Sequence, residues 1–312
     1  MRPRVSIIIP AYNPGSFLME AIESVRGQTF IDWEAIIIDD GSEPPIQLPV
    51  PVDPRIRLLR QPNRGLSAAR NAGLDASCGR LIAFLDADDI WLSTKLDTQV
   101  EVLEANPDAI LCHTQMQFID EKGEEGGLGW GGEYETYEDL LDGCGVCVSS
   151  VVIKRDVLFR CGFFDPLLNT AQDYDLWLKA TRYGRMAALD EPLTLYRWHA
   201  NNMSRNYMQT HRELTAILQR HLEIARRAGD RKRIYQCQTG LRRTKRNTAM
   251  QAANAAVSSL KAGNKRHTLR HSGNALRIDF ATSALVFWRM CTGRLLKRIA
   301  CPSASPSWKC HT

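Results

Sequence analysis

The sequence contains no apolar run long enough to cross a bilayer, for which about 18–20 residues are needed. The longest candidate, residues 280–288, has nine residues and includes Thr282 and Ser283. A membrane-spanning helix is therefore not expected, and any contact with a membrane would be peripheral.

Paired cysteines at zinc spacing are also missing. The nine cysteines are scattered, and Cys144-x-x-Cys147 has no second pair, which favours ordinary buried residues over a metal site. Their odd number, together with a strand predicted from Val5 with no secretory signal before it, indicates reduced thiols. We therefore expect a cytoplasmic protein, with peripheral contact at the cytoplasmic face of the membrane as a further expectation.

Acidic residues are scarce in the last third of the chain. Residues 211–312 carry 21 Lys and Arg against 4 Asp and Glu, a net +17, whereas residues 1–210 carry 19 against 31, a net −12. The asymmetry predicts an acidic domain over 1–210 and a basic helical region over 211–312 that meets something anionic. The most basic part, residues 226–246, is not interleaved with aromatic residues, so specific binding of nucleic acid is not expected.

Two apolar segments run directly into carboxylates. Residues 33–38 precede Asp39 and Asp40, and residues 81–85 precede Asp86, Asp88 and Asp89. The uninterrupted apolar run over residues 81–85 is typical of a strand buried on both faces, and ligands of open α/β sheets bind beyond the carboxyl ends of the strands. Two acidic strand ends predict one shared site, in preference to carboxylates that only cap the following helices.

The spacing of Asp86 and Asp88 suits a divalent cation. Residues two apart on an extended chain project the same way, so both carboxylates can face one ion. Mg²⁺ and Mn²⁺ prefer hard oxygen ligands and are commonly held by one or two carboxylates plus phosphate oxygens. The sequence therefore predicts Mg²⁺ or Mn²⁺ as the cofactor.

The remaining pattern predicts a doubly layered α/β domain followed by helices. Strands are expected over residues 5–10, 33–38, 56–59, 81–85, 109–112, 116–119, 149–153 and 192–197. Helices are expected over residues 17–27, 66–76, 93–105, 173–183 and 239–260, with another from about residue 213. Residues 44–54 read as a loop and residues 121–132 as a mobile loop. The alternating order predicts a mostly parallel, Rossmann-like sheet flanked by helices.

Five blocks in this order resemble the family 2 glycosyltransferases with the GT-A fold. The blocks are residues 5–13 (VSIIIPAYN), 39–42 (DDGS), 63–71 (NRGLSAARN), 86–89 (DADD) and 172–173 (QD). The resemblance covers about residues 5–205. It implies metal-dependent, inverting transfer of a sugar from a nucleotide-diphosphate donor, a UDP-sugar foremost, to a hydroxyl of a glycan or lipid-linked acceptor. Such a reaction would serve the synthesis of a surface or extracellular polysaccharide.

The resemblance also implies where the donor binds. The implied nucleotide-sugar site comprises Pro10, Ala11, Tyr12, Asn13, Asp39, Asp40, Arg70, Asp86 and Ala87. The ring of Tyr12 would stack on the base, and Asp39 or Asp40 would accept hydrogen bonds from base and ribose, the choice between them being open. Arg70 would meet phosphate near a helix N-terminus, with a surface ion pair as its alternative.

Metal ligands are implied as well. Asp88 matches the direct ligand, with Asp86 beside it and nearer the ribose. His199 lies where some relatives place a third ligand, and a solvated loop histidine is the alternative.

Asp173 matches the family's catalytic base, which takes the proton of the acceptor hydroxyl. Many relatives have Glu-Asp where this chain has Gln172-Asp173. Gln172 cannot act as a base and is expected to hydrogen-bond the acceptor. Trp177, on the same helical face as Asp173, is considered as an acceptor platform, although a core position is the favoured reading.

Other functions are weighed against these residues. A nucleotide-sugar-binding protein without catalysis would not need Asp173. A sugar-phosphate nucleotidyltransferase typically has a basic, Gly-rich loop after the first strand, whereas residues 11–15 contain no basic residue.

The end of the chain is expected to meet an anionic membrane through an interfacial helix, with packing on the catalytic domain as the equal alternative. Its apolar and basic residues are Phe280, Leu285, Val286, Phe287, Trp288, Arg289, Arg294, Lys297 and Arg298. Residues 301–312 are expected to be disordered.

Overall fold

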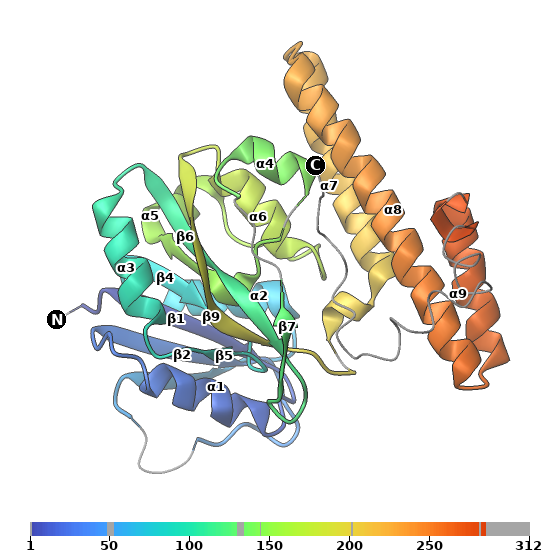
Figure 1. Ribbon diagram of the computed structural model, residues 1–312. Helices are drawn as coiled ribbons and strands as arrows, with labels where there is room; N and C mark the ends of the chain where they lie inside the picture. The colour runs from blue at the N-terminus through green and yellow to red at the C-terminus, as the bar shows by residue number, and fades with distance from the viewer. Residues whose placement is uncertain are drawn as a thin grey trace. The chain divides into compact units, whose positions relative to one another are not determined.

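The structure, a computed structural model, describes residues 2–48, 53–129, 134–143, 145–200, 202–280 and 282–284 (Figure 1). The chain divides into two compact units, residues 1–140 with 144–200 and residues 141–143 with 201–312. The first unit is α/β and the second is helical. The division falls after Ala200, ten residues before the boundary predicted at 210.

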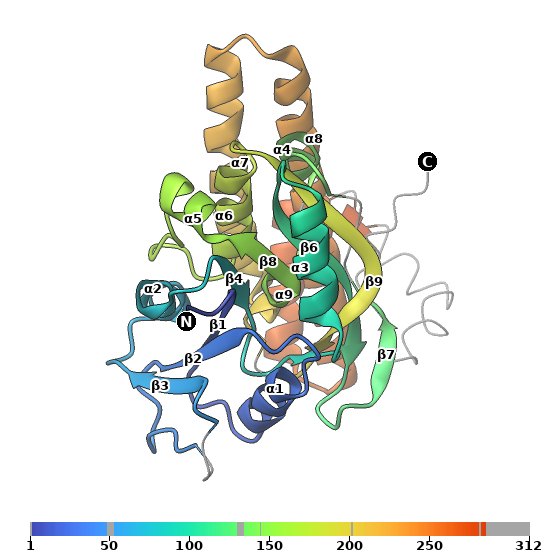
Figure 2. The same cartoon turned by 90° about the vertical axis from the view of Figure 1, so that its left-hand side faces the viewer.

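One sheet of nine strands organises the first unit. Its order is β3-β2-β1-β4-β8-β6-β9-β5, with β7 paired to β6. The strands are β1 (Val5–Ala11), β2 (Trp33–Asp39), β3 (Ile56–Arg60), β4 (Leu81–Phe84), β5 (Ile90–Trp91), β6 (Ala109–Ile119), β7 (Glu125–Leu128), β8 (Val151–Lys154) and β9 (Arg185–Arg197). Figure 2 shows β1, β2 and β4 side by side.

Strand direction changes across the sheet. β3, β2, β1 and β4 are mutually parallel, while β8 is antiparallel to both β4 and β6, and β9 is parallel to β6. The mostly parallel sheet that was expected is thus found only in the N-terminal half, and the other half is mixed. The parallel half matters for the site because its strands all end at one edge.

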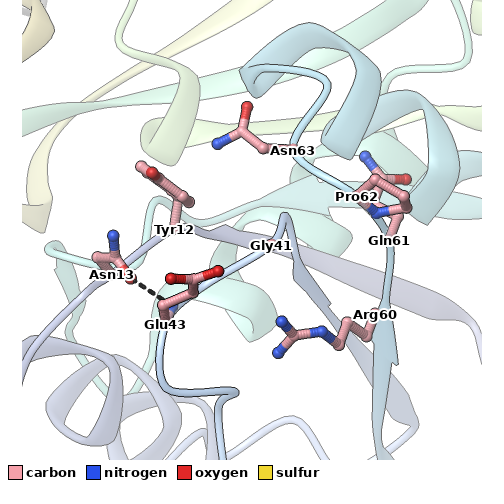
Figure 3. Close-up of a pocket in the computed structure, with 8 residues that line it drawn as sticks. All are labelled: Tyr12, Asn13, Gly41, Glu43, Arg60, Gln61, Pro62 and Asn63. Carbon is pink, nitrogen blue, oxygen red and sulfur yellow. Dashed lines mark hydrogen bonds between the residues drawn. The ribbon is translucent and has the colours of Figure 1, made fainter.

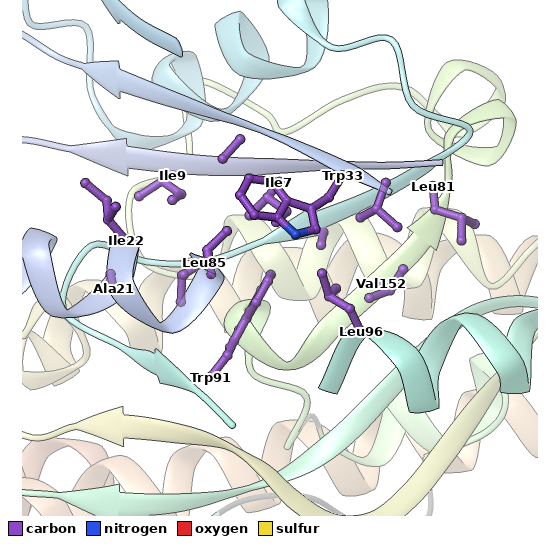
Figure 4. Packing of buried hydrophobic residues seen from close by; sticks show 14 of the residues in the cluster. Ile7, Ile9, Ala21, Ile22, Trp33, Leu81, Leu85, Trp91, Leu96 and Val152 are labelled. Carbon is purple, nitrogen blue, oxygen red and sulfur yellow. The ribbon is translucent and has the colours of Figure 1, made fainter. Parts of the chain in front are cut away.

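Helices cover both faces of the parallel half. α1 (Phe17–Arg26) and α3 (Lys95–Ala105) pack on one face, where Ile7 and Ile9 of β1 meet Ile22 of α1 and Leu96 of α3 (Figure 4). α2 (Leu66–Ala76) and α6 (Gln172–Ala180) pack on the other face, which alternation along the strands makes equally apolar. The two remaining helices of this part are α4 (Tyr137–Asp142) and α5 (Arg155–Cys161).

Several segments differ from the sequence prediction. Residues 109–119 form the single strand β6, whose polar centre conceals its continuity; His113 is buried there and its Nε2 bonds to the carbonyl of Tyr134 at 2.9 Å. The predicted mobile loop contains β7, which pairs with β6. The helix predicted from Ser93 begins at Lys95, and its N-cap residue, Thr94, makes no side-chain capping bond. The side chain of Gln28 instead accepts from the N–H of Leu96 in the first turn at 3.0 Å.

The second unit consists mainly of three helices, α7 (Tyr207–Arg227), α8 (Arg231–Lys261) and α9 (Lys265–Ile278). Gly229, with φ of +66°, makes the tight turn between α7 and α8, and Asp230 then caps α8 by accepting from the backbone N–H of Arg233. Alanines at 249, 252 and 253 are buried, so small side chains let the helices approach closely.

Over the described part of the chain, no helix combines the length and hydropathy needed to cross a membrane. The predicted interfacial helix falls largely beyond this part, since only Phe280 among its quoted residues is described. Residues 301–312, predicted to be disordered, also lie outside the described residues.

Candidate active site

The ends of three parallel strands bring separate loops together. In the strand register Ala11 faces Asp39 and Asp39 faces Arg60, so the residues that follow β1, β2 and β3 meet at one edge. A cavity of about 780 Å³ opens there. Figure 3 shows its lining residues, Tyr12, Asn13, Gly41, Glu43, Arg60, Gln61, Pro62 and Asn63. Of these, the sequence predicted only Tyr12 and Asn13 as site residues.

The loop after β1 presents an aromatic ring to this cavity. Tyr12 is 56% exposed, and Pro10 and Ala11 before it are buried in β1. Asn13 has a φ of +47° and bonds the loop after β2: its backbone N–H donates to Ser42 Oγ at 2.9 Å, and its Oδ1 accepts from the N–H of Glu43 at 2.9 Å. The ring of Tyr12 is therefore held at the mouth of the cavity by a fixed backbone.

Asp39 supports the cavity from beneath. Its carboxylate is buried and accepts from the N–H groups of Ser42 at 2.7 Å and Ile46 at 3.2 Å, and from Nη1 of Arg60 at 2.9 Å. Burial acts to raise the pKa of Asp39, but these hydrogen bonds and the charge of Arg60 outweigh it and hold the pKa below its usual value. Asp39 thus keeps Arg60 at the rim as a charged group.

Asp40 holds the loop between β3 and α2. Its buried carboxylate accepts from Nε2 of Gln61 at 2.7 Å and from the N–H groups of Arg64 and Gly65, each at 2.9 Å. Neither Asp39 nor Asp40 lines the cavity itself. Direct contact of one of them with a base stays a prediction, and the structure adds that both shape the loops which do line the cavity.

Arg70 joins the helix α2 to the acidic end of β4. Its side chain is buried, its Nη2 lies 2.5 Å from Oδ1 of Asp86, and its guanidinium lies 5.2 Å from the ring centre of Phe164. Its Nε and Nη1 are buried without a hydrogen-bond partner among the described residues. A buried guanidinium with unused N–H groups is costly unless an anion completes it, so Arg70 is suited to hold phosphate. Arg70 does form an ion pair, as the alternative held, but with Asp86 and from a buried position. Its contact with phosphate stays a prediction.

The carboxylate predicted as the direct metal ligand lies beside the predicted third ligand. Oδ2 of Asp88 is 2.8 Å from Nε2 of His199, which brings the ends of β4 and β9 together. His199 also lies against Phe17, with ring centres 5.4 Å apart, so it is not a loosely solvated loop residue. Burial and then the charge of Asp86 raise the pKa of Asp88. Ala87 is half-buried between the two acids.

A network that the sequence did not reveal fixes this acidic loop. Asp89 is buried and accepts from Ser149 Oγ at 2.6 Å and from the backbone N–H of Arg197 at 3.0 Å. The buried Arg197 side chain donates to the carbonyl of Asp88 at 3.0 Å and to Glu20 at 2.6 Å. Burial, with the charges of Asp88 and Asp86, raises the pKa of Asp89 well above its usual value. The sequence hinted at this network only through Asp89, the third acid of the cluster. The partners Ser149, Glu20 and Arg197 are distant in the chain, so no local pattern links them to it.

Asp173 is placed near Arg70, in the first turn of α6. It is half-buried, and Oδ1 accepts from the N–H of Tyr174 at 2.7 Å. Burial raises the pKa of Asp173 to about 6, and the nearby charge of Arg70 opposes that rise. A carboxylate with this pKa is a stronger base than an ordinary Asp and is still ionised at neutral pH.

The two predicted acceptor residues fare differently. Trp177 is completely buried, 6.4 Å from Phe84 between ring centres, so the prediction of an acceptor platform is wrong and the residue belongs to the core. Asp173 and Trp177 lie on the same face of α6, but Trp177, one turn further along the helix, is already in the hydrophobic core. Gln172 is buried, and its Oε1 has no partner among the described residues. A donor from a bound acceptor would satisfy that oxygen.

The donor atoms fit a divalent cation only in part. A carboxylate oxygen of Asp88 and the imidazole nitrogen of His199 face each other, a ligand pair that suits Mn²⁺ and, through the oxygen, Mg²⁺. Asp86 instead turns towards Arg70, and the described residues contain no assembled group of three such ligands. The crowded charges of Asp86 and Asp88 would still be relieved by a cation. Asp88 and His199 therefore fit a metal ion that completes its coordination with oxygen atoms of a bound substrate and of water.

Comparison with protein families gives a match to one of them. The model of the family described as glycosyl transferase family 2 matches residues 6–161, which is half of the chain. The chain is also similar to the Escherichia coli UDP-Glc:alpha-D-GlcNAc-diphosphoundecaprenol beta-1,3-glucosyltransferase WfgD. The two are 33% identical over 189 residues, which cover 60% of this chain and 73% of WfgD. The chain spans about a third of the length of the Rickettsia felis and Rickettsia conorii glycosyltransferases that it also matches.

Solved structures share the fold. The structure of Staphylococcus aureus TarS 1–349 in complex with UDP superposes with a TM-score of 0.59 at 14% identity, covering 94% of this chain and 92% of that one. The mannosyltransferase PcManGT from Pyrobaculum calidifontis, in complex with GDP-Man and Mn²⁺, gives a TM-score of 0.56 at 17% identity, covering 92% and 84%. These likenesses extend over the α/β unit and beyond it.

Proposed function

This chain belongs to glycosyl transferase family 2, and we propose that it transfers a sugar from a nucleotide-diphosphate donor to a hydroxyl of a glycan or lipid-linked acceptor. One observation carries the proposal. The buried guanidinium of Arg70 is paired with Asp86, and its charge also acts on Asp173. We infer from this that the acidic end of β4 and the candidate base are parts of one site.

The nucleotide of the donor would occupy the cavity at the ends of β1, β2 and β3. Tyr12 offers a ring face to the base, and Asn63 and Gln61 offer amides to its polar edge. We propose a UDP-sugar as the donor. TarS in complex with UDP, and the UDP-Glc named for WfgD, support this choice.

The diphosphate would lie beside Arg70, whose two unpartnered nitrogen atoms can donate to phosphate oxygens. Mg²⁺ or Mn²⁺ would be held by Asp88 and His199, with Asp86 close by. Such a cation supplies Lewis-acid neutralisation of the charge on the departing diphosphate. The complex of PcManGT with Mn²⁺ supports a metal of this kind.

Asp173 would act as the base. It would accept the proton of the acceptor hydroxyl as that oxygen attacks the anomeric carbon from the side opposite the diphosphate, which inverts the configuration. Gln172, in the same turn of α6, would orient the acceptor through its unpartnered Oε1. An acceptor of surface-polysaccharide synthesis, glycan or lipid-linked, is supported by the diphosphoundecaprenol-linked substrate named for WfgD.

The basic helices would bring the protein to an anionic membrane surface from the cytoplasmic side. The first turns of α8 carry exposed basic residues at 231–233, and no acid follows Asp230 within α8. We expect flotation with vesicles containing anionic phosphatidylglycerol in low salt and release in high salt. Equal flotation with neutral vesicles would contradict this attachment.

Donor turnover without any acceptor tests the proposed function. The protein is incubated with Mn²⁺ and UDP-, GDP- or dTDP-sugars, and nucleotide release and donor binding are measured separately. We expect one donor to bind in the presence of the metal and to be hydrolysed slowly. Failure of every donor to bind would overturn the transferase proposal, and donor binding with no nucleotide release would favour a protein that binds donors only.

Replacing the ring of Tyr12 should weaken donor binding. For Tyr12→Ala we expect a loss of about 1–3 kcal/mol in donor affinity, the usual contribution of one aromatic stack, whereas Tyr12→Phe keeps the ring and should bind nearly as well. Calorimetric titration with the donor gives both values. Equal weakening in the two variants would place the contribution in the hydroxyl group instead of in stacking.

Activity should depend on pH through Asp173. Because burial raises the pKa of this carboxyl to about 6 and only the ionised form is a base, kcat/KM for donor turnover should fall about tenfold per pH unit below 6. Donor affinity, measured at each pH, separates this effect from changes in metal or donor binding. A fall beginning only near pH 4, where an ordinary Asp titrates, would exclude Asp173 as the group responsible.

A further inference from the structure

A second cavity lies where the parallel strands begin, at the opposite end from the proposed donor site. It has a volume of about 460 Å³, and its lining includes Arg2, Arg4, Arg80, Arg155, Ser77 and Cys78. It is formed where β1 and β4 begin, beside the end of α2 (Figure 2). Since β1 spans seven residues, about 20 Å of strand separates this cavity from the donor site.

Positive charge in this second cavity exceeds the negative charge that faces it. Its lining contains four arginines and no acid. Arg4 and Arg80 both pair with the same carboxylate, that of Glu104, so one of the two charges stays uncompensated. Glu34 touches the lining, because its Oε1 accepts from the N–H of Cys78 at 2.9 Å and from Sγ of Cys78 at 3.1 Å, but its charge is balanced by Arg57, which is outside the lining.

The other two arginines have no acidic partner in the described part of the chain. Nη1 of Arg155 donates to the carbonyl and the hydroxyl of Ser77, both at 2.6 Å and both neutral. Arg2 is exposed and forms no ion pair with the acids that the structure describes. The Nε atom of Arg4 is buried without a partner. Several guanidinium groups whose charge is not fully compensated therefore line one cavity.

The geometry keeps these groups in place. The guanidinium of Arg155 lies 5.0 Å from the ring centre of Phe159 and that of Arg4 lies 5.5 Å from the ring centre of Phe30, so cation–π contacts help to hold both groups in position. Gly79 lets the chain pass close to β1, because a Cβ there would lie 2.6 Å from the backbone nitrogen of Ser6.

We propose that this arginine cavity is a second, non-catalytic binding site for a phosphate-bearing anion. Arginine forks match the oxygen atoms of phosphate and diphosphate groups, and a cavity with about three uncompensated positive charges suits a multiply charged group better than a single carboxylate. A free diphosphate compound and the headgroup of an anionic phospholipid share this chemistry.

Cys78 provides a reporter inside the cavity. It is exposed, and the other cysteines that the structure describes are buried or half-buried, so its alkylation by N-ethylmaleimide can be followed on its own peptide by mass spectrometry. The reaction is run in EDTA with inorganic diphosphate, or with vesicles of phosphatidylcholine that do or do not contain phosphatidic acid. An anion in the donor site cannot shield Cys78 across the length of β1.

We expect diphosphate or the phosphatidic acid vesicles to slow alkylation of Cys78 at least about fivefold. Protection by diphosphate alone identifies a free phosphate compound as the ligand class, and protection by the vesicles as well identifies a headgroup. In the variant Arg2→Gln/Arg80→Gln, which removes two exposed charges, the anion concentration needed for half protection should rise at least about tenfold.

The control variant Arg182→Gln/Arg227→Gln removes two exposed charges elsewhere. Its Cys78 should be protected at the same anion concentration as in the wild type. If neither probe slows alkylation of Cys78, the proposal is overturned. It is also overturned if the anion concentration needed for half protection rises equally in the two double variants. Metal-dependent donor binding, measured in parallel, should be unchanged in all of them, which separates this site from the proposed function.

Discussion

Asp173→Asn should abolish sugar transfer while leaving the donor bound. The substitution keeps the size of the side chain and its bond to the N–H of Tyr174, but an amide cannot accept the acceptor's proton. General base catalysis typically contributes 10²- to 10⁴-fold, so we expect kcat to fall by about that factor. Nucleotide release from the preferred donor with Mn²⁺ measures kcat, and calorimetry measures donor affinity.

The matched control for this variant is Asp156→Asn, which changes an exposed carboxylate in the same unit. It should turn over the donor like the wild type, and both variants should melt at the wild-type temperature. Wild-type kcat in Asp173→Asn would remove Asp173 from the mechanism. A loss of donor affinity equal to the loss of kcat/KM would assign it to binding instead.

Asp88→Ala should lose metal-dependent donor binding and turnover together. The substitution removes the carboxylate that faces His199, so the cation would keep the imidazole and lose its direct oxygen ligand. Because charge neutralisation by a metal is worth several kcal/mol, turnover should fall at least about 100-fold. Donor titrations with and without Mn²⁺, alongside nucleotide release, measure both effects.

Two comparisons make this result specific. Asp75→Ala, which removes an exposed carboxylate at the end of α2, should leave Mn²⁺ dependence intact. His199→Ala should weaken the metal requirement in the same direction as Asp88→Ala, because both side chains belong to the same pair. If Mn²⁺ stimulates Asp88→Ala as strongly as the wild type, the cation is held elsewhere.

Local pattern was sufficient for much of the fold. Predominantly apolar segments predicted β1, β2 and β4 to within a residue or two, because strands buried on both faces consist mainly of apolar residues. Ser6 in β1 and Glu34 in β2 are the polar exceptions. The helix over residues 66–76 was predicted at its observed bounds. Polar residues hid the continuity of β6 and the pairing of β7, since partner strands, and not their own pattern, stabilise those segments.

In the site, too, some features follow from local sequence pattern and others from contacts between distant segments. The linear pattern was enough to pick out the ring of Tyr12 and the acids after β2 and β4 at strand ends, and Asp173 at the start of a helix. Ordered blocks were enough to indicate the family, and the family match confirms it.

The contacts that those residues make depend on the folded chain. It buries Trp177 in the core, turns Asp86 towards Arg70, and locks Asp89 with Ser149 and Arg197. The fold also gathers four arginines, from three separate stretches of chain, at the end of the sheet where β1 and β4 begin. The physical reason is that burial, pKa and ion pairing depend on neighbours brought together by strand pairing across tens of residues, and a linear pattern reports only the nearest ones.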